Sequence, residues 1–171
     1  MKYKFSFLIF SVLFFGQSSK IEDEYSIKTL FIYNFTKYID WPAAVQKNVF
    51  EIDVIGESDI LKPLNELARN KKINQKPIVI KVIEAETEAP GDIVFIPFSK
   101  SKKLGEVLKN CKGKSALVVT EAPELAVKGA TINFKTVDNK IRFELNQAAA
   151  KNSGLKLSSQ LIELSIPVDS R

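Results

Sequence analysis

The sequence contains no histidine, the side chain that most often transfers protons or binds metals near neutral pH. Serine–histidine and cysteine–histidine nucleophilic mechanisms are therefore excluded. The single cysteine, Cys111, cannot form an intramolecular disulfide, and one thiol with carboxylates is a poor zinc ligand set. We expect Cys111 to be buried, and a thiol that pairs with another chain is the alternative. The glycines are isolated, so the sequence has no glycine-rich phosphate loop.

Several carboxylates lie close enough in sequence to serve in principle as acid and base. They are Glu51 and Asp53 on one predicted strand, Asp92 before another, and Glu84, Glu86 and Glu88 in one loop. Nothing in the sequence gives two members of a pair different environments, so we interpret them as solvated. The scattered lysines are also interpreted as solvated surface, which argues against a nucleic-acid partner. We expect no enzymatic activity, no cofactor and no metal site.

Asn34 lies within the most apolar predicted helix, where a buried amide without partners costs about 1–3 kcal/mol. We expect it to bond a neighbouring loop, and a position facing a ligand pocket is the alternative. The aromatic residues nearby present the same choice, because Tyr33 or Trp41 could lie at a rim and anchor a partner protein. Leu161 and Leu164, in the last predicted helix, are two further candidate contacts with a partner.

The elements that position these side chains are predicted from hydrophobic periodicity. Glu22 to Tyr38 is predicted to be a helix with an apolar stripe, and Trp41-Pro42 ends it. Predicted strands at 50–55, 77–83, 92–96 and 115–119 alternate with helices that begin near Ser58 and Ser101. Such alternation indicates a parallel sheet with helices on its faces.

The pattern changes towards the C-terminus. Residues 130–134 and 141–145 are predicted to form an antiparallel hairpin around the turn 137–140. Asn146 and Ser158 are expected to cap two short helices. We therefore predict one three-layer α/β domain over residues 22–166, with a mostly parallel sheet and an antiparallel hairpin near the C-terminus.

The first residues differ from the rest of the chain. A basic start at 1–4 precedes an apolar run at 5–15 and the small residues Gly16-Gln17-Ser18. This is the pattern of a signal peptide, and the apolar run is well short of the roughly 20 residues that a membrane-spanning helix needs. We predict that residues 1–18 are a signal peptide that is removed on export, so the protein is expected in the periplasm. A short anchor that is never cleaved is the alternative.

Several segments, in the same order along the chain, resemble the YfiR family. They are Ile27–Pro42, Val54–Gly56, Asp92–Ile96, Gly129–Phe134 with Ile141–Asn146, and Ser153–Ser159. The family motif corresponds here to Asn34, Trp41, Pro42, Gly56, Gly129, Asn133, Phe143, Asn146, Gly154 and Ser158. We interpret most of these positions as fold determinants, and we expect Gly129 and Gly154 to adopt backbone conformations closed to other residues.

This resemblance implies a periplasmic regulator without enzymatic activity. Such a protein binds and inhibits a membrane-bound signalling protein, most often a diguanylate cyclase that makes cyclic di-GMP, although a histidine kinase is another expected partner. The resemblance also implies a homodimer. Characterised members use cysteine pairs, so redox control by an internal disulfide does not carry over to a chain with Cys111 alone.

The alternative function is a periplasmic small-molecule-binding module that feeds a membrane sensor kinase. Open α/β sheets bind ligands at the carboxyl ends of their strands. In this sequence Gly56, Pro97–Ser99 and Thr120-Glu121 are predicted to lie there.

Overall fold

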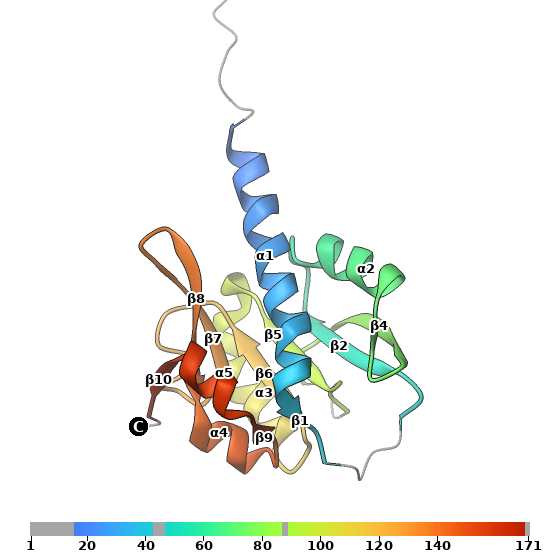
Figure 1. Ribbon diagram of the computed structural model, residues 1–171, viewed down its shortest axis with the longest axis vertical. Coiled ribbons are helices and arrows are strands. Elements are labelled where there is room, and N and C mark those ends of the chain that lie inside the picture. Colours follow the sequence, from blue (N-terminus) through green and yellow to red (C-terminus); the bar gives the residue numbers. More distant parts are fainter. Residues whose placement is uncertain (1–15, 43–46, 87–88, 170–171) are drawn as a thin grey trace, which may run out of the picture.

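The computed structural model describes residues 16–42, 47–86 and 89–169, with side chains from residue 21 onwards. The predicted signal peptide lies mostly outside the described residues. Eight strands form one sheet in the order β10-β8-β7-β6-β5-β2-β4-β3, and helix α1 crosses one face of it (Figure 1). The neighbours from β7 to β4 in this order are parallel, whereas β7 and β8 form an antiparallel hairpin. The predicted fold class is confirmed.

The bounds of the elements are as follows. The strands of the large sheet are β2 (Phe50–Ile55), β3 (Lys72–Ile73), β4 (Lys76–Ile83), β5 (Ile93–Ile96), β6 (Leu117–Thr120), β7 (Ile132–Val137), β8 (Lys140–Asn146) and β10 (Ile166–Val168). The helices are α1 (Gly16–Tyr38), α2 (Leu61–Asn70), the 3-10 helix η1 (Phe98–Lys103), α3 (Leu104–Cys111), α4 (Gln147–Asn152) and α5 (Ser159–Leu164). A separate antiparallel pair joins β1 (Ile39–Asp40) to β9 (Lys156–Leu157).

The sheet separates two apolar cores, which makes the domain three-layered. On one face Ile52 and Phe95 pack with Phe35 of α1. On the other face Val94 packs with residues of α3, including Cys111. Both faces of β5 and β6 are covered, so these strands consist of continuous apolar runs, as parallel strands buried on both sides do. The predicted burial of Cys111 is confirmed.

Helix α1 begins earlier than predicted and is rotated relative to the predicted stripe. It starts at Gly16 rather than Glu22, and it buries Lys28 and Thr29 while Ile27 remains exposed. The interpretation of every lysine as solvated is therefore wrong for Lys28. Periodicity failed here because polar residues such as Lys28 and Thr29 lie on the buried side of α1, whereas apolar residues such as Ile27 and Leu30 lie on the exposed side.

The turns of the two tightest hairpins have the same backbone conformation. Asp138 and Asn139 link β7 to β8 with φ values of 50° and 58°. Asn74 and Gln75 link β3 to β4 with φ values of 50° and 67°. Two central residues with positive φ give the turn whose twist matches that of the flanking strands. The first hairpin was predicted, whereas the second was not, because β3 is only two residues long.

Two predicted helix caps and two predicted glycine conformations are confirmed. The Asn146 carboxamide accepts a hydrogen bond from the Ala149 amide at 2.9 Å and donates one to the Ala126 carbonyl at 2.7 Å. The Ser158 hydroxyl accepts from the Leu161 amide at 3.2 Å. Gly129 and Gly154 have φ values of 112° and 71°, which L side chains rarely adopt.

These caps give a graded prediction. Replacing Ser158 with alanine removes the hydrogen bond that caps the start of α5, so we expect the free energy of unfolding to fall by about 1 kcal/mol. Asn146→Ala also leaves the buried Ala126 carbonyl without that donor, so we expect a loss of about 2–3 kcal/mol. Urea unfolding followed by circular dichroism measures both. Equal losses in the two variants would show that the bond to Ala126 contributes nothing.

Candidate functional site

A buried ion pair closes the carboxyl end of the central strands. The Glu121 carboxylate follows β6 and meets the Lys28 ammonium of α1 at 2.6 Å, with the two side chains 3% and 8% exposed. The same carboxylate accepts hydrogen bonds from the Tyr25 hydroxyl at 3.1 Å and from the Phe98 amide at 2.9 Å. Glu24 meets Lys28 from the solvent side at 2.6 Å. The cluster therefore fastens α1 to the end of the sheet.

The Tyr25 hydroxyl of this cluster is unsuited to proton transfer. Burial, followed by the charge of Glu121, raises the pKa of Tyr25 far above its ordinary value of 10. Tyr25 therefore remains a hydrogen-bond donor at any physiological pH. The arrangement acts as a structural lock, and sequence reasoning missed it because α1 and β6 are far apart in the chain.

The structure places all three positions predicted for a ligand crevice at the carboxyl ends of strands β2, β5 and β6, and one of them, Gly56, is covered. A Cβ atom at Gly56 would lie 2.8 Å from Cε of Lys100, whose side chain covers the glycine. The Phe98 amide donates to Glu121, but the Phe98 side chain is 63% exposed and borders a hollow of about 520 Å³. A hollow of about 410 Å³ remains beside Glu121, between α1 and the strands β7 and β8. The predicted crevice is therefore filled at Gly56, whereas space remains beside Phe98 and Glu121.

Asn133 links three strands inside the sheet. Its carboxamide accepts from the Thr120 hydroxyl at 2.7 Å and donates to the Glu144 carboxylate at 2.9 Å. Lys135 meets the same carboxylate at 3.1 Å. These groups lie on β6, β7 and β8, so the amide fixes the register at the point where the sheet changes from parallel to antiparallel.

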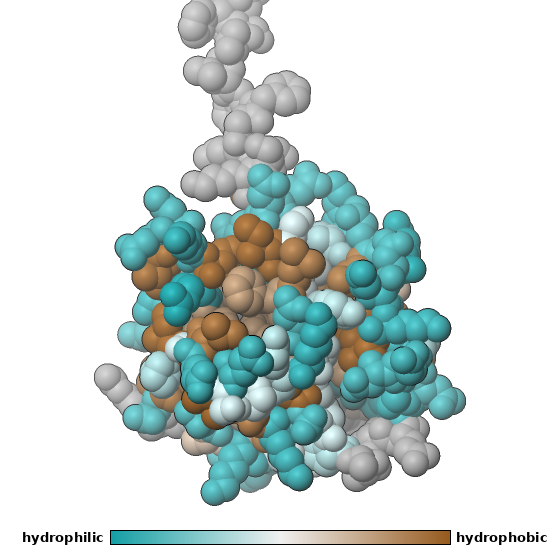
Figure 2. Space-filling model, viewed as in Figure 1, coloured by the Kyte–Doolittle hydropathy of each residue, from teal (hydrophilic) through white to brown (hydrophobic). Residues whose placement is uncertain are grey.

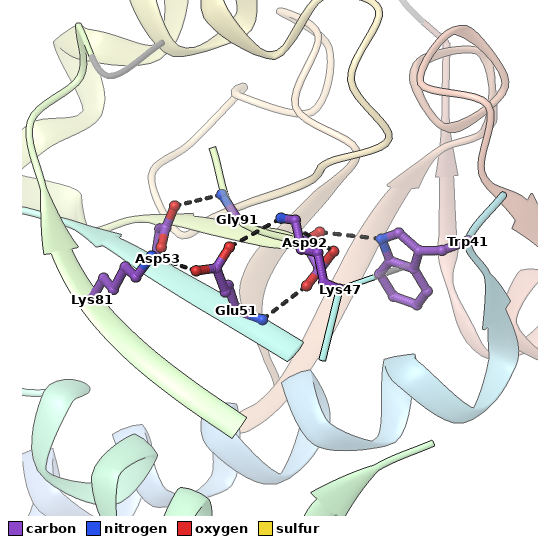
Figure 3. A network of polar contacts seen from close by, with 7 residues as sticks. All are labelled: Trp41, Lys47, Glu51, Asp53, Lys81, Gly91 and Asp92. Atoms are coloured by element: carbon purple, nitrogen blue, oxygen red, sulfur yellow. Dashed lines mark hydrogen bonds and ion pairs between the residues drawn. The ribbon is translucent and has the colours of Figure 1, made fainter. Parts of the chain in front are cut away.

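A second polar network lies at the amino end of the strands (Figure 3). The Trp41 indole donates to the Asp92 carbonyl at 3.2 Å, and the Asp92 carboxylate accepts from the Glu51 amide at 2.8 Å. Glu51 pairs with Lys47 at 3.0 Å and also with Lys81. The network holds Trp41 as one wall of a hollow of about 860 Å³ that opens at this edge of the sheet.

Asp53 is buried, which contradicts its interpretation as a solvated carboxylate. It is 1% exposed, and one of its oxygens accepts from the Gly91 amide at 2.5 Å. Its other oxygen has no hydrogen-bond partner among the described residues. A Cβ atom at Gly91 would lie 2.9 Å from the Glu51 carbonyl, so only glycine allows this close approach.

The neighbours Glu51 and Asp53 have opposite electrostatic environments. Burial raises the pKa of Asp53, whereas the ion pair with Lys81, and then that with Lys47, lowers the pKa of Glu51. Such a difference is typical of acid–base pairs in enzymes. Here the protonated partner would be inaccessible to a substrate, so the geometry offers no working pair. No group of metal-ligating side chains is present among the described residues.

An apolar surface runs along α1 towards α5, as Figure 2 shows where brown side chains gather over these elements. Ile27 and Leu30 of α1 are 45% and 56% exposed, and Leu164 of α5 is 54% exposed. Phe31 and Ile162 are partly buried against the core beside them. We call these five residues the α1–α5 face.

The residues predicted to contact a partner protein differ in their exposure. Leu164 belongs to the α1–α5 face, whereas Leu161 is 1% exposed and packs in the core, so its prediction as a contact is wrong. It is buried because the inner side of the short helix α5 faces the sheet. Tyr33 and Trp41 are partly buried, and Trp41 lines the hollow at the amino end of the sheet.

Asn34 is exposed on α1, so the prediction of a buried amide is wrong. It accepts a hydrogen bond from the Lys37 ammonium at 2.9 Å on the helix surface. The remaining family-motif positions are structural or lie at the rim of the amino-end hollow. Phe143 is buried in the core, Gly56 has a φ of 65°, and Pro42 is exposed beside Gly154.

A family model described as YfiR/HmsC-like matches residues 25–166, which is most of the chain. The chain belongs to the YfiR/HmsC-like family. This confirms the resemblance, and membership supports a regulatory rather than a catalytic protein that acts in the periplasm. Within the described residues, no helix has the length and apolarity needed to cross a membrane. No curated protein matches the sequence.

Solved structures support the fold of this YfiR/HmsC-like chain. An ABC domain in complex with L-Trp from Streptococcus pneumonia matches with a TM-score of 0.52 and 11% identity. A conserved domain protein from Vibrio cholerae O1 biovar eltor matches with a TM-score of 0.55 and 10% identity. The matches cover 73% and 84% of this chain but only 57% and 59% of those proteins. This chain therefore corresponds to part of a larger α/β arrangement in each case.

The buried pair of Lys28 and Glu121 gives a second prediction. Lys28→Met leaves a buried carboxylate without its counter-charge, so we expect the free energy of unfolding to fall by about 3 kcal/mol or more. The double variant Lys28→Met/Glu121→Gln leaves no uncompensated charge and should recover part of the loss. Chemical denaturation measures all three proteins. A double variant less stable than the single one would contradict this account.

Asp53 gives a third prediction, on pH. Its raised pKa means that the folded state keeps a proton that the unfolded chain releases near pH 4. The contribution of Asp53 to stability therefore falls as the pH rises from about 4 through the raised pKa, and it remains low above that pKa. Asp53→Asn should lack this fall. We would measure urea unfolding of both proteins over a pH series, and identical slopes would refute the assignment.

Proposed function

We propose that this YfiR/HmsC-like protein is exported, loses residues 1–18, and works as a folded domain over residues 22–166 in the periplasm. There it binds the periplasmic part of a membrane-bound signalling protein and holds that protein inactive. The partner proposed is a diguanylate cyclase, so release of the inhibitor raises cyclic di-GMP. A homodimer is part of this proposal as the form in which the domain acts. The family match supports the regulatory role, whereas the partner and the inhibition are our inference.

The observation that carries the proposal is the α1–α5 face. Three large aliphatic side chains stand about half exposed on it beside two partly buried ones, whereas isolated exposed apolar residues are normal on any surface. Burying an aliphatic side chain contributes about 1.5–3 kcal/mol, so such a cluster can supply several kcal/mol to a complex. Aliphatic side chains cannot select a charged metabolite, but they suit another protein.

The rest of the structure is consistent with action by contact. Asp53, the one carboxylate among the described residues whose pKa is raised, is inaccessible, and the buried pair of Lys28 and Glu121 fastens α1 in place. The exposed face of α1 is therefore presented on a rigid support. A rigid surface loses little conformational entropy on binding, which favours affinity.

A second candidate function is binding of a small molecule at the amino-end hollow. The hollow of about 860 Å³ has the size of ligand sites, and it combines the apolar walls Trp41 and Phe50 with polar groups of Glu51 and Asp92. Thermal-shift screening against metabolites would detect a ligand there. A ligand at 100 times its dissociation constant adds about 2.7 kcal/mol to stability, and Trp41→Ala should abolish that gain.

The α1–α5 face gives a fourth prediction. In the double variant Ile27→Gln/Leu30→Gln, inhibition of the cyclase should be lost, and cellular cyclic di-GMP should rise towards the level of a strain without the protein. The side chains are exposed, so the free energy of unfolding should change by no more than about 0.5 kcal/mol. Cyclic di-GMP is measured by mass spectrometry in cells that express equal amounts of each variant.

Phe98→Gln is the matched control, because Phe98 is also an exposed large apolar residue but lies outside the α1–α5 face. It should leave cyclic di-GMP unchanged. If the Ile27/Leu30 variant folds, accumulates normally and still represses, the proposed surface is wrong. If no membrane sensor is recovered with the wild-type protein from gently solubilised membranes, the proposed function itself is wrong.

A further inference from the structure

Within the described part of the chain, strand β4 lacks a partner strand along most of one side. β4 pairs with β2 along its whole apolar part, from Ile78 to Ile83. On its other side β4 pairs only at Lys76 and Pro77, with the short strand β3. Among the described residues, no strand covers positions 78–83 on that side. We call this stretch the open edge; it lies beyond β2 at one margin of the molecule (Figure 1).

The backbone groups of the open edge can be assigned by alternation. The Ile83 carbonyl accepts from the Gly56 amide, which follows β2, so Ile83 directs its backbone groups towards β2. Successive residues of a strand direct them to opposite sides. Ile78, Ile80 and Val82 therefore present their N–H and C=O groups to the open side. This assignment agrees with Lys76, which pairs with Ile73 of β3 on the same side.

The open edge lacks most of the features that protect edge strands. It carries no proline between 78 and 83 and no bulge in its pairing with β2. Its only charged side chain, Lys81, is paired with Glu51. Val82 is 48% exposed, and Val79 and Ile80 are partly exposed. An exposed apolar edge of this kind is a template for another extended segment.

The lysines beside the open edge indicate which kind of peptide segment would bind there. Lys71 and Lys72 are exposed and Lys76 is partly exposed, and all three lie where β3 and β4 meet. No ion pair is formed by these three lysines among the described residues. An incoming strand with acidic residues at the β3 end would therefore gain attraction to three unpaired ammonium groups.

A second copy of the chain fits this edge poorly. Antiparallel pairing places outward-facing residues opposite one another. A two-fold axis at Ile80 would place the partner's Ile83 opposite Pro77, a position that Lys72 already occupies. A two-fold axis at Lys81 would place two lysines directly opposite each other, which is destabilising. These are the two-fold registers that use most of the open edge.

We propose that the open edge of β4 binds an extended apolar segment of a partner protein, with acidic residues at the end beside β3, as an added strand. The strand supplies main-chain hydrogen bonds to Ile78, Ile80 and Val82, and the acidic residues meet the lysines. This surface is separate from the α1–α5 face and does not depend on the identity of the membrane sensor.

The experiment uses the folded protein with defined peptides. The probes are two peptides, Glu-Glu-Val-Thr-Val-Thr-Val and the peptide with the reversed sequence. Both are used because the added strand can run parallel or antiparallel to β4. The controls are the same peptides with Lys in place of Glu, and peptides N-methylated at alternate residues. Affinity is measured by fluorescence polarisation, and amide hydrogen exchange of Ile80 and Val82 is followed by NMR. The mass of the free protein is measured by light scattering.

We expect one acidic peptide to bind and to slow exchange at Ile80 and Val82 about tenfold or more. Val82→Pro replaces an outward N–H with a ring and should weaken binding about tenfold or more, whereas Val82→Thr keeps the N–H and should bind normally. Lys72→Glu should also weaken binding. N-methylated peptides should not bind, which tests the pairing without any change to the protein.

Three results would overturn the proposal. One is no binding of either acidic peptide at millimolar concentration. Another is binding that Val82→Pro and N-methylation both leave unchanged. The third is a dimer in the free protein with Ile80 and Val82 already protected, which would assign the edge to a second copy. None of these results depends on cyclic di-GMP, so failure here is distinct from failure of the proposed function.

Discussion

The packing of α1 across the sheet determines which surfaces this protein offers. Phe35 of α1 contacts Phe134 and Phe143 of the C-terminal hairpin, with ring centroids 6.0 and 4.9 Å apart. Phe31 adds further edge contacts to the same two rings. Aromatic pairs of this geometry contribute beyond the area that they bury. The helix is thus held in its C-terminal half by the rings of Phe31 and Phe35 and near its centre by the Lys28–Glu121 pair.

This packing explains why α1 occupies part of the region where related architectures place a ligand and presents an apolar face on its outer side. In open α/β sheets the carboxyl ends of the strands form the usual crevice. Here Tyr25 and Lys28 of α1 reach into that region and satisfy Glu121. The cost of this arrangement is that the opposite side of an apolar helix, with Ile27 and Leu30, faces outwards. The contact of α1 with Glu121 and the exposure of the face follow from the same helix orientation.

Much of the fold could be predicted from the sequence, because local signals decide it. The apolar runs of β5 and β6, the Asp138-Asn139 turn and the caps at Asn146 and Ser158 act over a few residues each. The site could not be predicted in the same way. Which side of α1 is buried depends on partners such as Glu121, about ninety positions away. The burial of Lys28 and the exposure of Asn34 were therefore inaccessible to periodicity.

The environments of Glu51 and Asp53 could not be predicted from the sequence for the same reason. Asp53 alternates with Glu51 in the sequence as any solvated strand pair would, yet Asp53 is buried against Gly91 whereas lysines reach Glu51. A usable signal was present in part, since Asp53 precedes Val54-Ile55-Gly56 in a strand whose only other charged residue is Glu51. A strand buried on both faces cannot leave one side chain solvated. That inference needs the knowledge that β2 is central, which comes from the sheet order rather than from the strand itself.

The two proposed surfaces share one support. Helix α2 packs against both α1 and β4, and it carries Leu64 and Leu67 into the common core. The α1–α5 face and the open edge therefore depend on the same packed layer, although their side chains do not overlap. A substitution in that layer would disturb both surfaces through folding, whereas a change at Leu30 or at Val82 acts on one alone. Surface substitutions are for this reason the ones that can separate the two kinds of contact.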